Sequence, residues 1–326
     1  MKAIIADQPG DESVLKLGDA PDPAAGPADL LIRVRYAGVN RADLMQRQGF
    51  YPPPPGASEL IGLECSGEVI AIGAAVKGWH LGDRAMALLA GGGYAELVAV
   101  HAGCAIRVPA ALSDQEAAAL PEVFMTAYFN FFMLAAIQRG ESALIHGGGS
   151  GVGTASINLL KLAGVRSIVT AGTDAKCEQC LRIGASVAIN YNAGPFAPKV
   201  IEATSGRGAD VILDSIGAAY LGQNLEALAQ DGRLVLIGLM KGAQAEINLL
   251  AVLRRHLRIF GSTLRSRPAA EKAAIVASFL QRFGDALERG QIKPPIHQVF
   301  PLAEAAAAHR MMQASEHFGK IVLRVE

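Results

Sequence analysis

A cluster of glycines at residues 147–153, with the sequence GGGSGVG, is the part of this chain best suited to binding a ligand. Residues 143–146 before it suit a strand buried on both faces, and the apolar spacing after Thr154 suits a helix packed on a sheet. A pyrophosphate can lie against bare backbone, where the free N–H groups of a helix start bind its oxygens. The pattern predicts a dinucleotide-phosphate cradle. Its residues are Gly148, Ser150, Gly151, Val152 and Gly153.

The cluster departs from the usual G-x-G-x-x-G pattern, because Ser150 stands at the middle glycine. For this fragment alone, a tight strand-to-helix turn without a ligand is the alternative interpretation. A triphosphate-binding loop is disfavoured, since Thr154 stands where that loop needs its lysine.

The end of the next predicted strand, residues 166–172, indicates which dinucleotide binds. An NAD site normally carries a carboxylate there for the ribose 2′-hydroxyl, about 20 residues beyond the glycines. This strand instead ends in Gly172 and Thr173, with Lys176 and Tyr191 following. A small residue, hydroxyl groups and an ammonium accept a 2′-phosphate, which a carboxylate would repel. The predicted cofactor is therefore NADPH.

Three other features have structural interpretations. Asp174 could oppose a 2′-phosphate, or it could cap a helix that begins near Ala175. Cys177 and Cys180 form a C-x-x-C in a predicted helix, without a second pair to complete a zinc site, and are interpreted as reduced thiols. His146 is interpreted as a packed residue at a strand end.

Two further buried strands are predicted, at residues 209–215 and 233–239, with helical segments between them. Strands that alternate with helices indicate an α/β fold with a doubly wound parallel sheet. In such a sheet the ligand lies beyond the carboxyl ends of the strands. Gly217 and Leu239 are therefore expected to border the cofactor.

Composition limits the classes of partner. The 326 residues include 30 basic and 30 acidic side chains with a net charge of zero, which argues against nucleic acid or an anionic membrane surface. The most apolar window, residues 123–137, is too short to span a bilayer. The first residues have no long apolar core, so no signal peptide is expected and a cytoplasmic location is predicted. The length suits two domains.

The first third of the chain has a different pattern of apolar residues from the rest. Alternating segments at residues 30–36 and 67–72 predict a mostly β domain. Between them, residues 38–58 form a long polar stretch with four consecutive prolines. A rigid loop of this kind can hold Tyr51 at the mouth of a cleft, and a simple surface connection is the alternative.

These motifs together resemble the quinone oxidoreductase, or zeta-crystallin-like, branch of the medium-chain dehydrogenase/reductase superfamily. The likeness is greatest to the stress-inducible NADPH quinone reductases. It is carried by NRADLMQRQG at residues 40–49, GLECSG at 62–67, GDR at 82–84, SGVG at 150–153 and FGKIVL at 318–323. The resemblance implies a GroES-like catalytic domain (residues 1–120 and 261–326), a Rossmann domain (121–260) and an active site between them.

The resemblance also bears on metal use. Zinc-dependent relatives have a cysteine in the first loop and a histidine in a G-H-E segment. This chain has Asn40 and Asp43 in the loop and Leu63 in GLEC, so it lacks the thiolate and imidazole that zinc would need. A metal-free site is expected.

Side chains must then polarise the substrate. Tyr51 is assigned a hydrogen bond to the acceptor oxygen, Asn40 the orientation of substrate or nicotinamide, and Asp43 is a further candidate. Thr126 resembles the family threonine near the nicotinamide; its alternative is a hydroxyl bonded to its own helix. Lys320, in FGKIVL, is placed with the cofactor-binding residues.

The predicted activity is NADPH-dependent reduction of a quinone. Reduction of an activated double bond, as in 2-alkenals or enones, is the second hypothesis, and a cofactor-binding protein without enzymatic activity is the third. The polar stretch from Asn40 to Tyr51 argues against the third. Residues 257–264 (LRIFGSTL) read as an edge strand, which predicts a two-fold homodimer, as the resemblance also implies.

Overall fold

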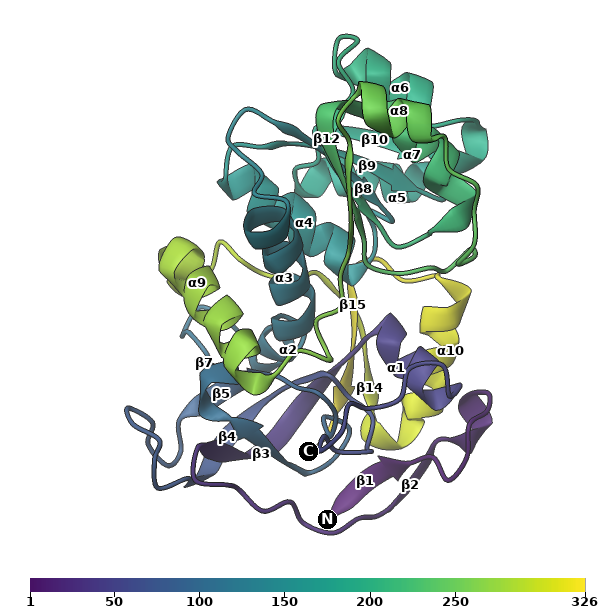
Figure 1. Ribbon diagram of the computed structural model, residues 1–326. Coiled ribbons are helices and arrows are strands. Elements are labelled where there is room, and N and C mark those ends of the chain that lie inside the picture. Colours follow the sequence, from purple (N-terminus) through teal and green to yellow (C-terminus); the bar gives the residue numbers. More distant parts are fainter. Residues whose placement is uncertain (326) are drawn as a thin grey trace. The chain divides into compact units, whose positions relative to one another are not determined.

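The computed structural model describes residues 1–325 and divides the chain into two compact units (Figure 1). The first unit joins Met1–Met125 to the segment from Leu264 onward, and the second is Thr126–Thr263. Helix α3 (Pro121–Tyr128) contains one of the two boundaries.

The first unit is built on a mixed seven-stranded sheet. Its order is β14-β15-β3-β4-β5-β7, with β6 paired to β3, and β1 and β2 form a separate antiparallel pair. The predicted alternating segments are confirmed as β3 and β4. The strands are β1 (Lys2–Ile5), β2 (Lys16–Asp19), β3 (Asp29–Val39), β4 (Glu64–Ile72), β5 (Arg84–Leu88), β6 (Leu97–His101), β7 (Ala105–Arg107), β14 (Ile296–Pro301) and β15 (Lys320–Arg324).

The register of this sheet brings distant polar residues together. In the antiparallel pair of β15 with β3, Ile321 lies opposite Val39, which places Lys320 beside Asn40. In the pair of β3 with β4, Ala37 lies opposite Cys65, so Glu64 begins its strand close to the same point. Three segments far apart in the sequence thus meet at one end of β3.

Helices complete the first unit. The stretch at residues 38–58, expected to be a loop, contains helix α1, and the expectation is corrected there. Helix α10 packs on α1, β14 and β15, and the two helices share an apolar core that includes Leu44 and Met312. The helices are α1 (Arg41–Arg47), α2 (Asp114–Ala118), α9 (Ala269–Glu288) and α10 (Ala305–Ala314).

The second unit contains the expected doubly wound sheet. All six strands are parallel, in the order β10-β9-β8-β11-β12-β13. The order reverses between β8 and β11, the place where such sheets bind ligands. The strands are β8 (Ser142–His146), β9 (Arg166–Ala171), β10 (Val187–Asn190), β11 (Ala209–Asp214), β12 (Leu228–Leu236) and β13 (Arg258–Gly261).

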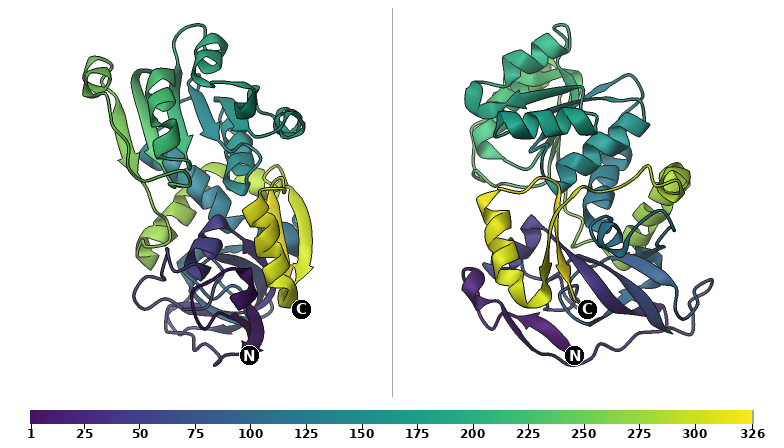
Figure 2. Two further views of the ribbon diagram at one scale, coloured as in Figure 1. Left: turned by 90° about the vertical axis from the view of Figure 1, so that its right-hand side faces the viewer. Right: turned by 180° about the vertical axis from the view of Figure 1, so that it is seen from behind.

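Helices cover both faces of this sheet (Figure 2). Helices α6 and α7 pack on one face, in a core that includes Leu144 and Ile212, while α4 and α5 contact β8, β9 and β10. These helices are α4 (Gly151–Leu162), α5 (Asp174–Ile183), α6 (Ala197–Ala203), α7 (Leu221–Ala227) and α8 (Leu249–Arg254). Within residues 1–325, no helix combines the length and apolar character needed to cross a bilayer.

Two sequence expectations concern β12 and β13, at one edge of the parallel sheet. The edge strand predicted at residues 257–264 is confirmed as β13, which ends the strand order. The strand expected at residues 233–239 is shifted, because β12 runs from Leu228 to Leu236. The strand starts earlier because Leu228 pairs with Ala209 ahead of an irregularity that contains Asp231 (φ 59°), and it ends at Leu236, opposite Asp214.

Candidate functional site

The glycine loop between β8 and α4 fits a phosphate cradle. The Ser150 hydroxyl caps α4 by accepting the Gly153 N–H at 3.0 Å. A Cβ on Gly148 would lie 2.6 Å from the Cβ of Val169, and one on Gly153 would lie 2.6 Å from the Gly148 carbonyl oxygen. Both positions therefore require glycine. The Gly151 N–H lies in the first helical turn, where N–H groups lack helical acceptors and can bind an anion.

The end of β9 brings together the residues expected at the 2′-phosphate. A Cβ on Gly172 would lie 2.6 Å from the Tyr191 hydroxyl oxygen, so the tyrosine packs directly on the glycine. The Thr173 hydroxyl caps α5 by accepting the Lys176 N–H at 3.2 Å. The helix-cap interpretation of Asp174 is therefore wrong. Asp174 is the first residue of α5, and its carboxylate accepts the Asn190 amide at 2.7 Å.

Gly217 and Leu239, which were expected to border the cofactor, lie against each other. Gly217 has a φ of 83°, and a Cβ there would lie 2.9 Å from a methyl carbon of Leu239. The Asp214 carboxylate accepts the N–H groups of Ile216 at 2.6 Å and Gly217 at 3.2 Å. The carboxylate thus fixes the turn that follows β11.

A buried chain of polar groups supports that turn. The Asn224 amide donates to Asp214 at 3.0 Å, and its oxygen lies 2.7 Å from Nε2 of His146. Burial lowers the pKa of His146 to about 4, so its ring is neutral and donates from Nε2 to the amide oxygen. The prediction of a packed strand-end histidine is confirmed, since His146 is 3% exposed.

In the first unit, Lys320 is the centre of a buried polar cluster. Its ammonium donates to the Val39 carbonyl at 2.9 Å, to Asn40 Oδ1 at 2.6 Å and to Glu64 Oε1 at 2.6 Å. Lys320 is 2% exposed, and an ammonium has three donors in all. All of its hydrogen bonds are therefore made inside this unit rather than to a nucleotide.

The same cluster holds the other polar ends in place. The Asn40 amide donates to Glu64 Oε1 at 2.9 Å, and the second Glu64 oxygen accepts the Glu122 N–H at 2.9 Å. Glu64 thus hydrogen-bonds both to Lys320 of β15 and to the backbone at the start of α3. Sequence reasoning did not select Glu64, although it lies in the GLECSG motif.

Asp43 is fully buried beside this cluster. Its Oδ2 accepts the Asn40 N–H at 2.7 Å and the Tyr94 hydroxyl at 3.1 Å, while Oδ1 has no hydrogen-bond partner among residues 1–325. Burial raises the pKa of Asp43 to about 7, although the Asn40 N–H and the Lys320 charge oppose the shift. Near neutral pH this carboxyl is therefore poised between its two protonation states.

Two residues missed at the sequence level extend the Asp43 contacts. The Tyr94 hydroxyl lies 3.2 Å from His309 Nε2, and burial lowers the pKa of His309 to about 3. Because His309 is neutral, Tyr94 can donate to Asp43 and accept from the imidazole. Separations of 51 and 215 residues along the chain hide these contacts from local sequence patterns.

Tyr51 lies in a separate contact set around Arg265. Arg265 donates to the Tyr51 carbonyl at 2.9 Å, to the Ala90 carbonyl at 2.8 Å and to Gln46 Oε1 at 2.7 Å. Its guanidinium carbon lies 5.3 Å from the centre of the Tyr51 ring. Burial raises the pKa of the Tyr51 phenol, and within the described residues its hydroxyl has no hydrogen-bond partner. This hydroxyl can therefore donate to a ligand.

Thr126, the remaining catalytic candidate, is buried in α3 at the start of the second unit. Its carbonyl oxygen accepts the Asn130 amide at 2.8 Å. This bond ties the Asn130 side chain to the preceding turn of the helix.

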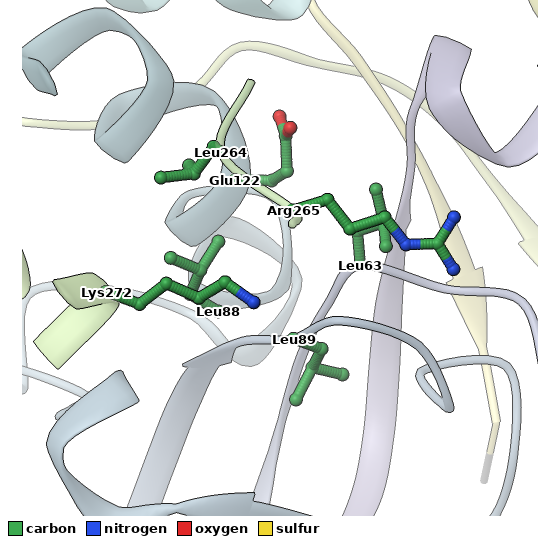
Figure 3. A pocket seen from close by; sticks show the side chains of 7 residues that line it. All are labelled: Leu63, Leu88, Leu89, Glu122, Leu264, Arg265 and Lys272. Atoms are coloured by element: carbon green, nitrogen blue, oxygen red, sulfur yellow. The ribbon is translucent and has the colours of Figure 1, made fainter. Parts of the chain in front are cut away.

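A small pocket lies next to Arg265 (Figure 3). Leu63, from the GLECSG motif, is part of its wall. Within the described residues, no group of three or more His, Cys, Asp or Glu side chains could hold a metal ion. The pocket is lined by Leu63, Leu88, Leu89, Glu122, Leu264, Arg265 and Lys272.

Comparison with known proteins places both units in described families. Residues 26–110 match the alcohol dehydrogenase GroES-like domain, and residues 151–281 match the zinc-binding dehydrogenase family. The chain is 30% identical to the human synaptic vesicle membrane protein VAT-1 homolog over 329 residues, which covers 96% of this chain and 83% of that protein. It is 31% identical over 324 residues to a phenolphthiocerol/phthiocerol polyketide synthase of Mycobacterium tuberculosis. That match covers 98% of this chain but only 14% of the synthase.

Solved structures share the whole fold. Mycobacterial Rv1454c, complexed with NADPH, superimposes with a TM-score of 0.88 at 29% identity and full coverage of both chains. A quinone oxidoreductase of Pseudomonas syringae pv. Tomato gives 0.89 at 26% identity, covering 99% of each chain. The CurK enoyl reductase gives 0.88 at 26% identity, covering 100% of this chain and 99% of that one. The expected combination of a GroES-like domain with a doubly wound parallel sheet is confirmed.

Proposed function

Because this chain belongs to the medium-chain dehydrogenase/reductase superfamily, we propose that it is an NADPH-dependent oxidoreductase that reduces a quinone without a metal ion. The observation that carries the proposal is the end of β9, where Gly172 packs on Tyr191 and Lys176 follows in α5. The quinone is proposed from the similarity to quinone oxidoreductases.

The second unit offers a chemically suitable set of groups for this cofactor. The N–H groups of the first turn of α4 would bind the pyrophosphate, while Thr173, Lys176 and Tyr191 would hold the 2′-phosphate. Gly217 and Leu239 would border the rest of the cofactor. When bound, NADPH supplies a hydride to the acceptor. Lys320 is left out of this set, because its three donors are already used.

Replacing Lys176 by Ala is expected to weaken NADPH binding by roughly 1.5 to 3 kcal/mol, because one charge-assisted contact to the 2′-phosphate is lost. NADH binding should stay nearly unchanged. Titration calorimetry with both cofactors measures the difference, with Lys161→Ala in the last turn of α4 as the control. Equal losses for the two cofactors, or a native preference for NADH, would contradict the assignment.

The first unit supplies donors for the acceptor. The Tyr51 hydroxyl is proposed to donate to the acceptor oxygen, and Asn40 to orient the substrate through the amide N–H that Glu64 does not use. Asp43, with its pKa near 7, is a candidate source of a proton, and Thr126 stays a proposed contact of the nicotinamide. The metal-free character is proposed from Asn40, Asp43 and Leu63, which replace the cysteine and histidine of zinc-dependent relatives.

Tyr51→Phe is expected to lower turnover with a quinone by about ten- to a hundredfold and to leave NADPH binding intact, since one uncharged donor is lost while the ring remains. Asn40→Ala should act in the same direction. Steady-state kinetics together with cofactor titration separate the two effects. Tyr36→Phe, which removes a hydroxyl bonded to Gln115, is the control. Unchanged kinetics in both Tyr51→Phe and Asn40→Ala would refute these roles.

Reduction of an activated double bond is the second candidate, and the similarity to the CurK enoyl reductase favours it. A panel of quinones, enones and 2-alkenals, assayed with NADPH and with NADH, distinguishes the two activities. Quinone turnover with NADPH supports the first proposal, and enone turnover without quinone turnover supports the second. A chain that binds NADPH but turns over none of these acceptors would support the non-enzymatic hypothesis.

Assembly is a separate proposal. Strand β13 ends the parallel sheet, with Ile259 and Phe260 near its middle. An exposed strand edge is a template for pairing with a second copy. A two-fold homodimer through β13 therefore stays our proposal for the assembled protein.

A further inference from the structure

The first unit holds two buried lysines with opposite surroundings. Lys320 is 2% exposed and donates to three oxygens. Lys272, in the first turn of α9, is 5% exposed as a residue, and no hydrogen bond or ion pair within residues 1–325 engages its ammonium. The nitrogen is not among the fully buried atoms that lack a partner, so the ammonium is accessible at the end of a buried, largely apolar stem. Lys272 therefore has an accessible cation that is available to a ligand.

The Lys272 side chain points into the pocket of Figure 3, among leucines. Leu63, Leu88, Leu89 and Leu264 offer no hydrogen-bond acceptor from their side chains. The Arg265 guanidinium points away from the lysine and is bonded to other groups, and the Glu122 carboxylate is also directed away. Among the side chains that line the pocket, none therefore accepts a hydrogen bond from the ammonium.

The cavity has a volume of about 10 Å³, which is room for one atom of the size of a water oxygen. The side chains around the Lys272 ammonium are mostly leucines, whereas buried waters typically make about three hydrogen bonds. An oxygen that belongs to a larger ligand does not need those further partners. The narrow inner end of the pocket therefore suits the oxygen end of a ligand better than a whole ring.

We propose that this pocket is an oxygen subsite, in which Lys272 binds an oxygen that carries or develops negative charge on an otherwise apolar, ring-containing ligand. The identification of that ligand with the electron acceptor rests on the proposed function. A cation among leucines attracts negative charge more strongly than it would in water. A quinone oxygen gains such charge as it is reduced, so Lys272 would favour the reduced, anionic form.

The charged and titratable groups around the ammonium are few. Burial lowers the pKa of Lys272; the Cys104 thiol raises it, and the Arg265 charge lowers it further. Burial raises the pKa of Cys104 to about 11, so this thiol is neutral at pH 7. No neighbouring anion therefore competes for the ammonium from that side.

The test uses 4-nitrophenol, an aromatic ring with an oxygen that ionises near neutral pH and changes colour when it does so. The probe is titrated into the full chain without NADPH or a quinone. The wild-type protein should bind the phenolate more tightly than the neutral phenol, and the pKa of the bound probe should fall below its value in buffer. Lys272→Met should weaken phenolate binding by roughly tenfold or more and restore the ordinary pKa of the probe. Lys77→Met, at an exposed lysine of the same unit, is the matched control.

Equal binding to wild type and Lys272→Met, or an unshifted probe pKa in the wild type, would overturn the proposal. If Lys272→Met does not fold, Lys272→Gln takes its place, and Lys176→Ala shows whether the phenolate binds in the cofactor site instead. Phenolate selectivity without quinone turnover would refute the proposed function and keep the subsite. Quinone turnover without phenolate selectivity would refute the subsite and keep the proposed function.

Discussion

Lys320→Met is expected to destabilise the first unit by about 3 to 5 kcal/mol, the usual cost of removing one partner of a buried ion pair. The substitution leaves the Glu64 carboxylate without its cation at 0% exposure. It also removes the hydrogen bonds accepted by Asn40 and the Val39 carbonyl. The chain has a single tryptophan, Trp79, which lies in the first unit. Urea unfolding followed by its fluorescence therefore reports on this unit.

Two controls identify the pair as the cause. Adding Glu64→Gln to Lys320→Met removes the uncompensated charge, so the double variant should be more stable than Lys320→Met alone. Lys2→Met, which breaks the exposed pair of Lys2 with Asp19, should change the unfolding midpoint little. Equal midpoints for Lys320→Met and Lys2→Met would show that the buried pair does not hold β15 against β3.

Local sequence patterns were sufficient to predict those elements that form through interactions between residues near in the sequence. The glycine loop, the buried strands of the second unit and the alternating strands of the first all follow from short-range periodicity, and the structure confirms them. The cap of α5 is local too, but a threonine hydroxyl and a neighbouring carboxylate compete for it. Thr173 takes the cap because α5 begins at Asp174, and the Asp174 carboxylate instead accepts the Asn190 amide.

The buried cluster of the first unit could not be derived in this way. The hydrogen bonds of Lys320 with Glu64 and Asn40 span 256 and 280 residues, and they depend on the register of β15 against β3. Asn40 and Asp43 were selected as polar residues in a loop, whereas they lie at the start of α1 and face inward. The sequence pattern contains the residue types but not the pairings, because tertiary packing sets them.

Asp43→Asn is expected to stabilise the protein at pH 8, and by contrast to have little effect at acidic pH. The ordinary pKa of an aspartate is 3.8, and burial raises that of Asp43 to about 7. The folded state therefore binds this proton more tightly than the unfolded state does. Stability falls as the pH rises from about 4 to about 7 and then levels off. At about 1.4 kcal/mol per pKa unit, the loss is at most roughly 4 kcal/mol.

The asparagine keeps the oxygen that accepts from Asn40 and Tyr94 and carries no charge, so this pH dependence should vanish. Unfolding midpoints of wild type and variant at pH 5 and pH 8, followed by Trp79 fluorescence, give the difference, because all other groups titrate alike in both proteins.

Asp114→Asn is the matched control of opposite sign: Arg84 and Arg35 hold the pKa of Asp114 below its usual value. That variant should lose stability at pH 8. Parallel pH profiles for wild type and Asp43→Asn would show that Asp43 is ionised in the folded protein at neutral pH, and its candidacy as a proton donor would end with that result.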